Sequence, residues 1–293
     1  MSRGIERKLT GWKNTIEQAL DSAIPADEGV VELRRAMRYS LLSGGKRVRP
    51  LFVLASCEAV GGDPAEALAA ALSVEMIHTY SLIHDDLPAM DDDDLRRGRP
   101  TNHVVHGEAL AILAGDALHT LAFETLAEAP LPPARTRALV ALLAHAAGMD
   151  GMAGGQALDL AFEQRPASEE DVARIHRLKT GALIAACFQM GAVAGGAGRS
   201  AAHELGEIGR RVGLAFQIQD DVLDVTADAA TLGKTAGKDA AARKATWPAA
   251  VGLEAARRRA ADLFADALAR LGDLGRSAEV LEVLVRTLRD RER

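Results

Sequence analysis

The sequence has few cysteines, few aromatic residues and no surplus of positive charge, and each shortage excludes a class of protein. Its two cysteines, Cys57 and Cys187, lie in apolar stretches, which favours buried reduced thiols over a disulfide framework or a thiolate metal site. The formal net charge of −6 argues against a nucleic-acid partner, which would require a basic face. Reduced thiols are typical of a cytoplasmic protein.

Long uninterrupted apolar runs are also missing. Residues Met1 to Leu20 mix Arg, Lys and Glu with isolated apolar positions, so no apolar core of a signal peptide is present. Later apolar segments are interrupted by charges or glycines before they reach membrane-spanning length. We therefore expect no stable membrane anchor and a cytoplasmic location.

What the sequence has in abundance is alanine and leucine, which favour helices over strands. Apolar residues recur at spacings of three and four, which predicts helices in nine segments: Val30 to Leu42, Leu51 to Val60, Ala65 to Ile83, Glu108 to Leu126, Arg135 to Ala147, Ser168 to Ala194, Ala201 to Val225, Trp247 to Leu271 and Ala278 to Arg289. No domain boundary or repeat is visible. The prediction is an all-α fold with a single domain over residues 1–293.

Charge collects in the three longest breaks between these helices, at Ser43 to Pro50, Pro88 to His106 and Asp228 to Lys244. Loops that carry function often gather at one end of a rigid scaffold. The coincidence of long breaks and charge predicts one functional rim.

The first acidic cluster comprises Asp85, Asp86 and Asp91 at the end of a long apolar helix. These residues cannot share one straight helical face, but Pro88 disfavours helix at the preceding residue and should bend the chain so that Asp91 returns beside Asp85. A cluster of oxygen ligands suits Mg²⁺. The alternative is a solvated acidic helix end, which also fits the following aspartates 92–94.

A second acidic cluster lies inside an apolar helix, where Gln217, Asp220, Asp221 and Asp224 are spaced by one, three and four residues. Like charges at this spacing repel one another, so keeping them among apolar residues is reasonable if cations neutralise them. The pair of clusters favours a divalent-metal role over a solvated surface more strongly than either cluster alone.

Metal held only by carboxylates usually has phosphate completing its coordination, so cationic residues are expected nearby. The segment Gly44 to Pro50 separates two helices and supplies backbone N–H groups together with Lys46 and Arg49. Arg96 and Arg97 follow the first acidic cluster. The alternatives are a helix C-cap with solvated charges and ordinary surface arginines.

Five further polar residues are candidates. Lys179, followed by Thr180, interrupts an apolar helix and needs either an anionic partner or a route to solvent. Lys234 and Lys244 lie in the loop after the second acidic cluster, where they could close over a phosphate group. His78 lies two turns before Asp85 on the same helical side, although a lone histidine is more often a core residue.

Together these motifs resemble the trans-isoprenyl diphosphate synthase family, and within it most closely the bacterial farnesyl diphosphate synthases. The resemblance covers the segments Gly44 to Pro50, Tyr80 to Pro100, Gly115-Asp116, Gly154 to Gln156, Lys179-Thr180, Phe216 to Asp224 and Leu232 to Lys234. It implies the isoprenoid synthase helical bundle with a central active-site cavity. Terpene cyclases share that fold but usually carry an Asn/Ser/Glu motif in place of the second Asp cluster, so chain elongation is favoured over a lyase reaction.

The resemblance also implies a role for each candidate. Three Mg²⁺ ions, for which Mn²⁺ is expected to substitute, would be held by Asp85, Asp91 and Asp220, with support from Asp86, Asp221 and Asp224. The allylic diphosphate would be bound by Arg96, Lys179, Lys234 and Lys244. Isopentenyl diphosphate would be bound without metal by Lys46, Arg49, His78 and Arg97. The catalytic set would be Lys179 and Lys234 at the leaving group, with Thr180 and Gln217 facing the developing cation.

Product length is expected to depend on Tyr80 and Ser81, which precede Asp85 by about one helical turn. An aromatic residue at the first of these positions resembles enzymes that stop at farnesyl diphosphate, with geranylgeranyl or longer products as the alternative. The other interpretation of Tyr80 is a core aromatic. The resemblance further implies a homodimer. A catalytically silent partner subunit is less favoured, because the sets of Asp, Lys and Arg are complete.

Overall fold

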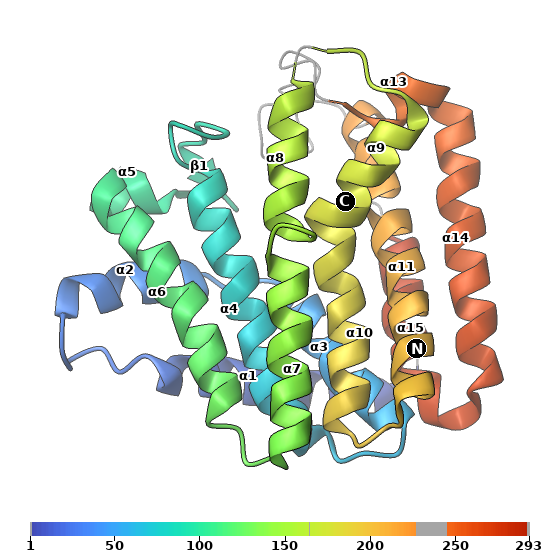
Figure 1. The fold of residues 1–293 in the computed structure, drawn as a ribbon, viewed down its shortest axis with the longest axis horizontal. Coiled ribbons are helices and arrows are strands. Elements are labelled where there is room, and N and C mark those ends of the chain that lie inside the picture. The colour runs from blue at the N-terminus through green and yellow to red at the C-terminus, as the bar shows by residue number, and fades with distance from the viewer. Residues whose placement is uncertain (1, 164, 227–244, 292–293) are drawn as a thin grey trace.

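The computed structural model describes residues 2–163, 165–226 and 245–291. Throughout this part of the chain the fold is helical, apart from a two-stranded antiparallel ribbon, β1 (Leu95–Arg96) and β2 (Arg99–Pro100). The predicted all-α class is therefore confirmed. Figure 1 shows long helices standing side by side in one bundle, with α1 crossing behind its lower half.

The helices follow one another in the order α1 (Arg3–Ala23), α2 (Val31–Leu41), α3 (Val48–Ala59), η1 (Pro64–Ala67), α4 (Leu68–Asp85), α5 (Asn102–His106), α6 (Glu108–Ala127), α7 (Pro133–Ala147), α8 (Met152–Phe162), α9 (Glu169–His176), η2 (Arg177–Gly181), α10 (Ala182–Ala194), α11 (Arg199–Thr226), α13 (Trp247–Val251), α14 (Leu253–Asp273), η3 (Gly275–Ala278) and α15 (Glu279–Arg289). Each of the nine predicted segments contains a helix. The short segments η1 and η3 are 3₁₀ turns, whereas η2 is a π-helix.

Within the part of the chain that the structure describes, three helices lie outside the predicted segments. Helix α1 buries only Ile5, Ile16 and Leu20 along its length, so its apolar signal is sparse. Helices α5 and α8 lie in segments that were interpreted as loop. The prediction of one helix from Trp247 to Leu271 is also wrong, because Gly252 adopts φ +85° and separates α13 from α14.

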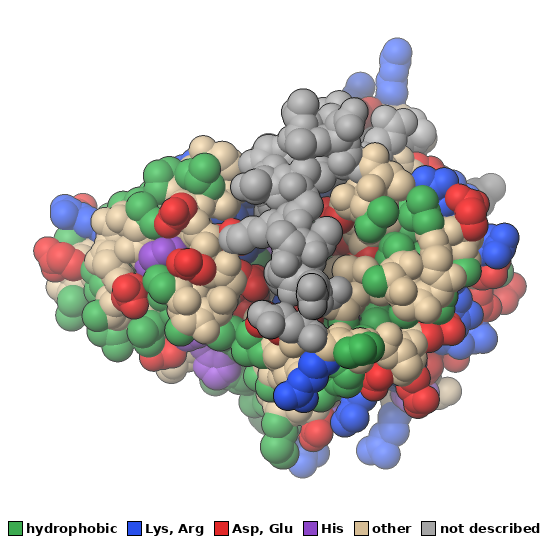
Figure 2. Space-filling model, turned by 90° about the horizontal axis from the view of Figure 1, so that it is seen from above, with side chains coloured by type: hydrophobic (Ala, Val, Ile, Leu, Met, Phe, Trp, Pro, Cys, Tyr) green, Lys and Arg blue, Asp and Glu red, His purple; other side chains and the backbone are tan. Residues whose placement is uncertain are grey.

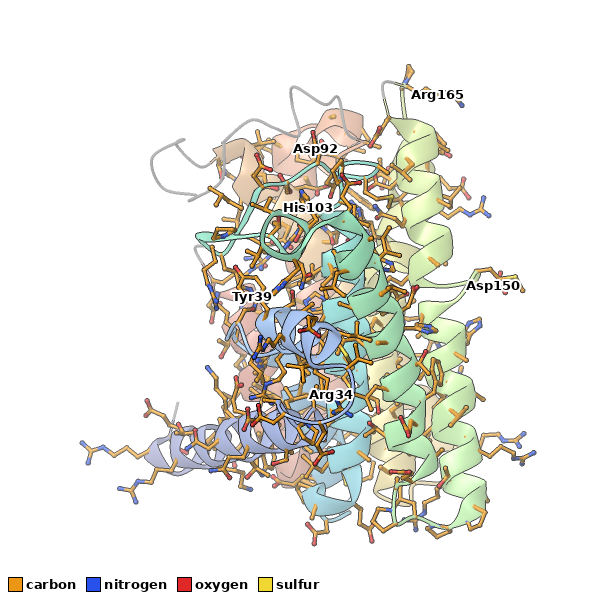
Figure 3. All side chains as sticks on the ribbon, turned by 90° about the vertical axis from the view of Figure 1, so that its left-hand side faces the viewer. Arg34, Tyr39, Asp92, His103, Asp150 and Arg165 are labelled. Atoms are coloured by element: carbon orange, nitrogen blue, oxygen red, sulfur yellow. The ribbon has the colours of Figure 1, made fainter. Side chains whose placement is uncertain are left out.

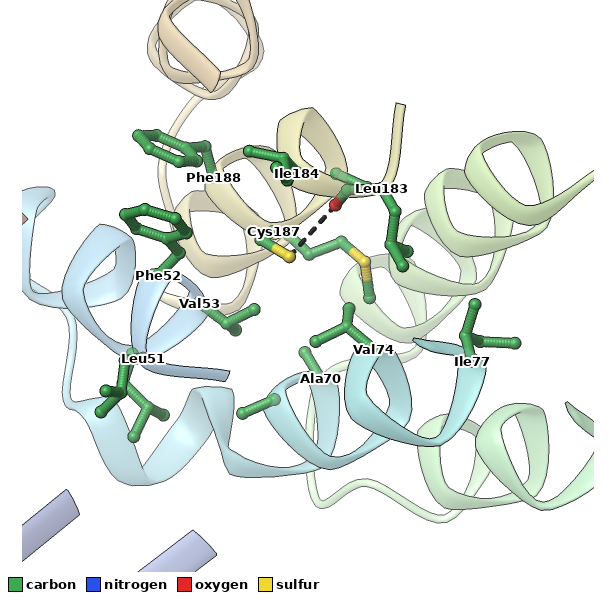
Figure 4. Close-up of a cluster of buried hydrophobic side chains, with 14 of the residues drawn as sticks. Leu51, Phe52, Val53, Ala70, Val74, Ile77, Leu183, Ile184, Cys187 and Phe188 are labelled. Atoms are coloured by element: carbon green, nitrogen blue, oxygen red, sulfur yellow. Dashed lines mark hydrogen bonds between the residues drawn. The ribbon is translucent and has the colours of Figure 1, made fainter. Parts of the chain in front are cut away.

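The core lies between α3, α4 and α10. Phe52 of α3 packs against Phe188 of α10 with ring centroids 4.8 Å apart (Figure 4). The Cys187 thiol donates to the Leu183 carbonyl at 3.1 Å, and burial raises the pKa of this thiol to about 12. Both cysteines are free and buried, as expected from the sequence.

Glycines allow α10 to approach its neighbours closely. A Cβ atom at Gly191 would lie 2.2 Å from the Val53 carbonyl oxygen of α3. On the other side of α10, a Cβ atom at Gly209 of α11 would lie 2.9 Å from the Ala185 Cα atom. Backbone atoms cannot move aside as a flexible side chain can, so these positions fix the spacing of the helices that enclose the site.

Two stretches, Glu108–Ala127 and Pro133–Phe162, are long and apolar enough to cross a membrane by length and composition alone. Both stretches are nevertheless interrupted by charged residues and glycines, Gly115 and Asp116 in the first and Gly148 and Asp150 in the second. In the structure one side of α6 packs against α4, and the second stretch is divided into α7 and α8 by a break at residues 148–151. The absence of a stable membrane anchor stays a prediction.

Replacing Gly191 by alanine should lower the free energy of unfolding by about 1–3 kcal/mol, because the new methyl group has no room against the backbone of α3. Gly11, in the middle of exposed α1, is the matched control. Nothing lies within 4 Å of a Cβ at that position. Gly11→Ala should raise the free energy of unfolding by about 0.5–1 kcal/mol, since alanine favours helix. Urea unfolding measures both; equal effects would contradict close packing at Gly191.

Candidate active site

The chain turns back on itself directly after α4. Helix α4 ends at Asp85, and after Pro88 the backbone N–H of Asp91 donates to the Asp85 carbonyl at 2.9 Å. The predicted return of Asp91 to Asp85 is therefore confirmed. The N–H of Asp93 likewise donates to the Asp86 carbonyl at 3.2 Å. Figure 3 shows Asp92, in the middle of this turn, at the upper end of the bundle.

Asp85 is crowded by other charges. Burial raises the pKa of its carboxyl to about 6, Lys179 opposes this rise, and the negative charge of Asp91 adds to it. The carboxylate is therefore strained by desolvation and by a like charge, as expected where a cation completes the site. Lys179 belongs to η2, so the first acidic cluster lies close to this π-helix.

Asp86 has different surroundings from Asp85. It is 3% exposed and accepts a forked contact from Arg96, whose Nε and Nη2 atoms lie 2.8 and 2.6 Å from Oδ1. Arg96 is held in place by β1 of the ribbon. In this structure the two predicted site residues therefore bind each other, and the pair fixes the Arg96 guanidinium beside the acidic turn.

The aspartates of the second acidic cluster point to different neighbours of α11. Asp220 contacts Arg291, and Asp224 is exposed. Asp221 is 7% exposed and accepts a 2.7 Å hydrogen bond from the Trp247 backbone N–H, with His176 Nε2 at 3.3 Å. Burial lowers the pKa of His176 to about 4, so the imidazole is neutral. Asp221 thus fastens the start of α13 to α11.

The π-helix η2 joins the two acidic clusters. Thr180 Oγ1 donates to Gln217 Oε1 of α11 at 2.6 Å, which brings two predicted catalytic residues together. Lys179 Nζ lies 2.6 Å from Asp159 Oδ2 of α8. A Cβ atom at Gly155 would lie 2.1 Å from the Lys179 backbone nitrogen, so glycine is required for α8 to approach η2. π-Helices are frequent at functional sites.

Asp159 is a site residue that the sequence analysis missed. It follows the Gly154 to Gln156 segment on the same helix, and its carboxylate is largely buried beside Lys179. The sequence does hint at such a residue, because a lysine in an apolar helix needs an anionic partner, but it does not say which carboxylate fills that role.

The predicted anion loop at Gly44 to Pro50 has the required unusual backbone. Gly44 and Gly45 adopt φ +79° and +140°, and Arg97 donates to the Gly44 carbonyl. Lys46 is exposed on this loop. Burial lowers the pKa of His78 well below its usual value, and Arg49 and Arg97 lower it further, so His78 is a neutral imidazole among cations. The structure therefore brings Arg49, Arg97 and His78 together, with Lys46 on the same loop.

Tyr80 lies on the α4 side of an aromatic cluster shared with α6. Its ring packs edge-on against His119 and His84, at centroid distances of 4.9 and 5.7 Å, and His119 packs against Phe123 at 5.2 Å. Ser81 Oγ donates to the His78 carbonyl at 2.9 Å. Tyr80 is consequently held in one orientation by residues that the sequence analysis did not single out.

Lys234 and Lys244 lie outside the described residues. Among the described ones, no three His, Cys, Asp or Glu side chains converge to form a complete metal site by themselves. Oxygen donors divided between α4 and α11 fit a hard cation only if an anion bridges them, which suits Mg²⁺ with a phosphate ligand. A separate cavity of about 660 Å³ lies between α7, α8 and α10, but no Asp of either cluster lines it.

Comparisons with known proteins agree on one family. The family model described as polyprenyl synthetase matches residues 30–284. The chain is 51% identical over 255 residues to a farnesyl diphosphate synthase from Escherichia coli (strain K12), covering 85% of each chain. It is 48% identical over 263 residues to geranylgeranyl pyrophosphate synthase 7, chloroplastic, from Arabidopsis thaliana, covering 88% of this chain and 76% of the relative.

A solved structure is similarly close. The geranyltransferase from Helicobacter pylori, complexed with magnesium and isoprenyl diphosphate, superimposes with a TM-score of 0.86 at 36% identity. The match covers 98% of this chain and 97% of that one. The helical bundle is therefore shared along almost the whole length of both chains.

The raised pKa of Asp85 predicts that Asp85→Asn stabilises the metal-free protein at about pH 8. The folded state holds the carboxyl proton up to about pH 6, whereas the unfolded chain loses it near the ordinary value of 3.8, so the folded wild type loses stability as the pH rises between these values. Asparagine avoids that loss. Thermal melting in chelator should show a higher Tm for the variant at about pH 8 and little difference at about pH 4. A Tm difference that does not change with pH would contradict the raised pKa of Asp85.

Proposed function

Because the chain belongs to the polyprenyl synthetase family, we propose that it condenses dimethylallyl or geranyl diphosphate with isopentenyl diphosphate to give farnesyl diphosphate and diphosphate. The observation that carries this proposal is the position of η2 between two acidic helices. The positive charge of Lys179 lowers the pKa of Asp85 on α4, and the Thr180 hydroxyl donates a hydrogen bond to Gln217 on α11. One anion can therefore be reached from both clusters.

Asp85 and Asp91 on one side and Asp220 on the other would hold Mg²⁺, with three ions as the expected number and Mn²⁺ as a substitute. The bound cations neutralise charge that grows on the leaving diphosphate. Support for magnesium comes from the oxygen-only donor set and from the similar Helicobacter pylori structure, which is a complex with magnesium and isoprenyl diphosphate. Asp86 positions Arg96, and Asp221 positions α13, so these two carboxylates act by orienting neighbouring groups.

The chain's own residues would lower the barrier by being preorganised around the breaking bond. Lys179 and Arg96 are held by Asp159 and Asp86, so their cationic groups need little rearrangement when diphosphate departs. The paired oxygens of Thr180 and Gln217 would face the allylic carbon, where positive charge develops. The double bond of isopentenyl diphosphate, oriented by the cluster around Arg49 and His78, then attacks that carbon, and the resulting cation loses a proton to give the new allylic double bond.

The farnesyl product is proposed from Tyr80. Its ring is held between His84 and His119, so it forms a rigid wall about one helical turn and a half below Asp85. Relatives include both farnesyl and geranylgeranyl synthases at similar identity, so overall similarity does not separate the two products. The rigid aromatic wall favours the shorter chain.

We propose that the active form is a cytoplasmic homodimer built on α6. Only 33% of the most apolar window of this helix is buried, and Ile112 and Leu113 are 44% and 54% exposed. Val104 and Val105 of neighbouring α5 extend the apolar surface, and Figure 2 shows apolar side chains among acidic ones on this side of the molecule. A second copy would cover these exposed apolar side chains.

The test of the function is incubation of the purified protein with dimethylallyl diphosphate, labelled isopentenyl diphosphate and Mg²⁺. Farnesyl diphosphate should form, and chelator should abolish its formation. Asp220→Ala should lower kcat by at least about a hundredfold, because the interaction is strongest as the leaving group gains charge. If the protein consumed the allylic substrate but left isopentenyl diphosphate untouched, it would be a lyase. Full turnover in excess chelator would exclude the metal assignment.

Tyr80→Ala should shift the products to twenty carbons or longer, because it removes the wall while leaving the acidic clusters intact. Phe123→Leu, on the far side of His119, is the matched control and should leave farnesyl diphosphate as the main product. Chromatography of the dephosphorylated products measures the change. An unaltered chain length in a folded Tyr80→Ala protein would show that Tyr80 is not the stop.

A further inference from the structure

Arg47 lies in the middle of the anion loop, yet its side chain points into the protein. It is 3% exposed and donates four hydrogen bonds: two to Glu17, one to Glu75 and one to the Leu41 carbonyl. Its guanidinium therefore has almost no donor left for a substrate phosphate. Although the motif places Arg47 beside Lys46, it cannot serve as a substrate ligand of the same kind.

These bonds tie the anion loop to three helices. Glu17 lies on α1, Leu41 ends α2, and Glu75 lies in the buried part of α4. Arg47 adopts φ +50°, a conformation that costs a non-glycine residue free energy and persists only where its surroundings enforce it. The buried bonds of its guanidinium supply that enforcement, and the loop takes the path that places Lys46 outside and the Arg49 guanidinium inside.

Glu75 is only half used by this contact. Its Oε1 atom lies 2.6 Å from Arg47 Nη1, whereas Oε2 is buried and has no hydrogen-bond partner among the described residues. The Nε donor of Arg49 is also buried and has no partner within the described part of the chain. Burial lowers the pKa values of Arg49 and Arg97, and the negative charge of Glu75 opposes this at both residues. Glu75 also lines the same small pocket as Arg47, Arg96 and Arg97, so its carboxylate lies among the cations next to the isopentenyl diphosphate cluster.

We propose that Glu75, anchored by Arg47, is a positioning residue that holds Arg49 and Arg97 in the geometry that binds the metal-free diphosphate. The inference rests on the proposed function, because it assigns isopentenyl diphosphate to this cluster. The positive charges of four arginines, at positions 47, 49, 96 and 97, all lower the pKa of His78, which shows that these arginines lie around one imidazole. Without a buried counter-charge they would repel one another when no diphosphate is bound. Glu75 offsets this repulsion before substrate arrives.

Positioning and simple charge balance predict opposite results for Glu75→Gln. The substitution removes a negative charge, so on electrostatic grounds alone an anionic substrate should bind more tightly. If Glu75 positions the arginines, the amide will lose the charged contact and present an N–H to donors, so binding should weaken. The sign of the change in KM therefore decides between the two.

The experiment is steady-state kinetics of the full chain with each substrate varied in turn. Glu75→Gln should raise KM for isopentenyl diphosphate by about tenfold, with a much smaller change in KM for the allylic substrate and in kcat. Glu58→Gln is the matched control, because Glu58 forms a 2.6 Å ion pair with Lys8 between α3 and α1 on the surface. It should leave both KM values unchanged.

A binding measurement without metal gives an independent readout. Isopentenyl diphosphate in chelator should raise the Tm of the wild type and of Glu58→Gln, and raise that of Glu75→Gln much less. If Glu75→Gln does not fold, the double variant Arg47→Met with Glu75→Leu replaces the buried pair by apolar groups of similar size, which buried ion pairs often tolerate. That variant should also show the raised KM for isopentenyl diphosphate.

The outcomes separate the positioning role from the proposed function. No turnover of isopentenyl diphosphate by the wild type would overturn the proposed function. Turnover by the wild type, combined with a lowered or unchanged KM for isopentenyl diphosphate in Glu75→Gln, would overturn the positioning role alone. Equal increases in both KM values would do the same, because they would indicate a general loss of structure.

Discussion

Like charges held close together at one end of a helical bundle are the constraint on which the rest of the structure depends. Carboxylates gather on α4 and α11, and cations gather on the anion loop, the ribbon and η2. Burial first, and neighbouring like charges second, raise the pKa of Asp85 and lower the pKa of His78, so both groups are costly to keep charged at this place. The bundle can hold them because its helices are locked together by close contacts such as Gly191 against Val53.

Paired contacts divide this charge into two compartments. Asp86 with Arg96 and Asp159 with Lys179 keep cations beside the acidic clusters. Glu75 with Arg47 keeps a carboxylate among the arginines of the anion loop. In the proposed function, the first compartment would receive the diphosphate that arrives with metal and the second the diphosphate that arrives without it.

Much of the fold could be predicted from apolar spacing, because a helix that buries one side must repeat apolar residues at that period. The spacing failed where this condition was not met. Helix α1 buries few residues, and Gly252 breaks a continuous pattern by adopting a backbone conformation that the pattern does not encode. The bend that returns Asp91 to Asp85 was predictable, because the proline that causes it is local.

The sequence by itself determined the helical class, the two acidic clusters and the cationic segments, because these depend on residue type and on spacing within one segment. Only the tertiary structure decided whether adjacent residues of one motif have the same contacts and the same role. Asp85 and Asp86 are adjacent, yet one is crowded by charge and the other is bound to Arg96. Lys46 is exposed whereas Arg47 is buried against Glu75. The physical reason is that a side chain's role depends on partners from distant helices, which the spacing of one segment does not specify.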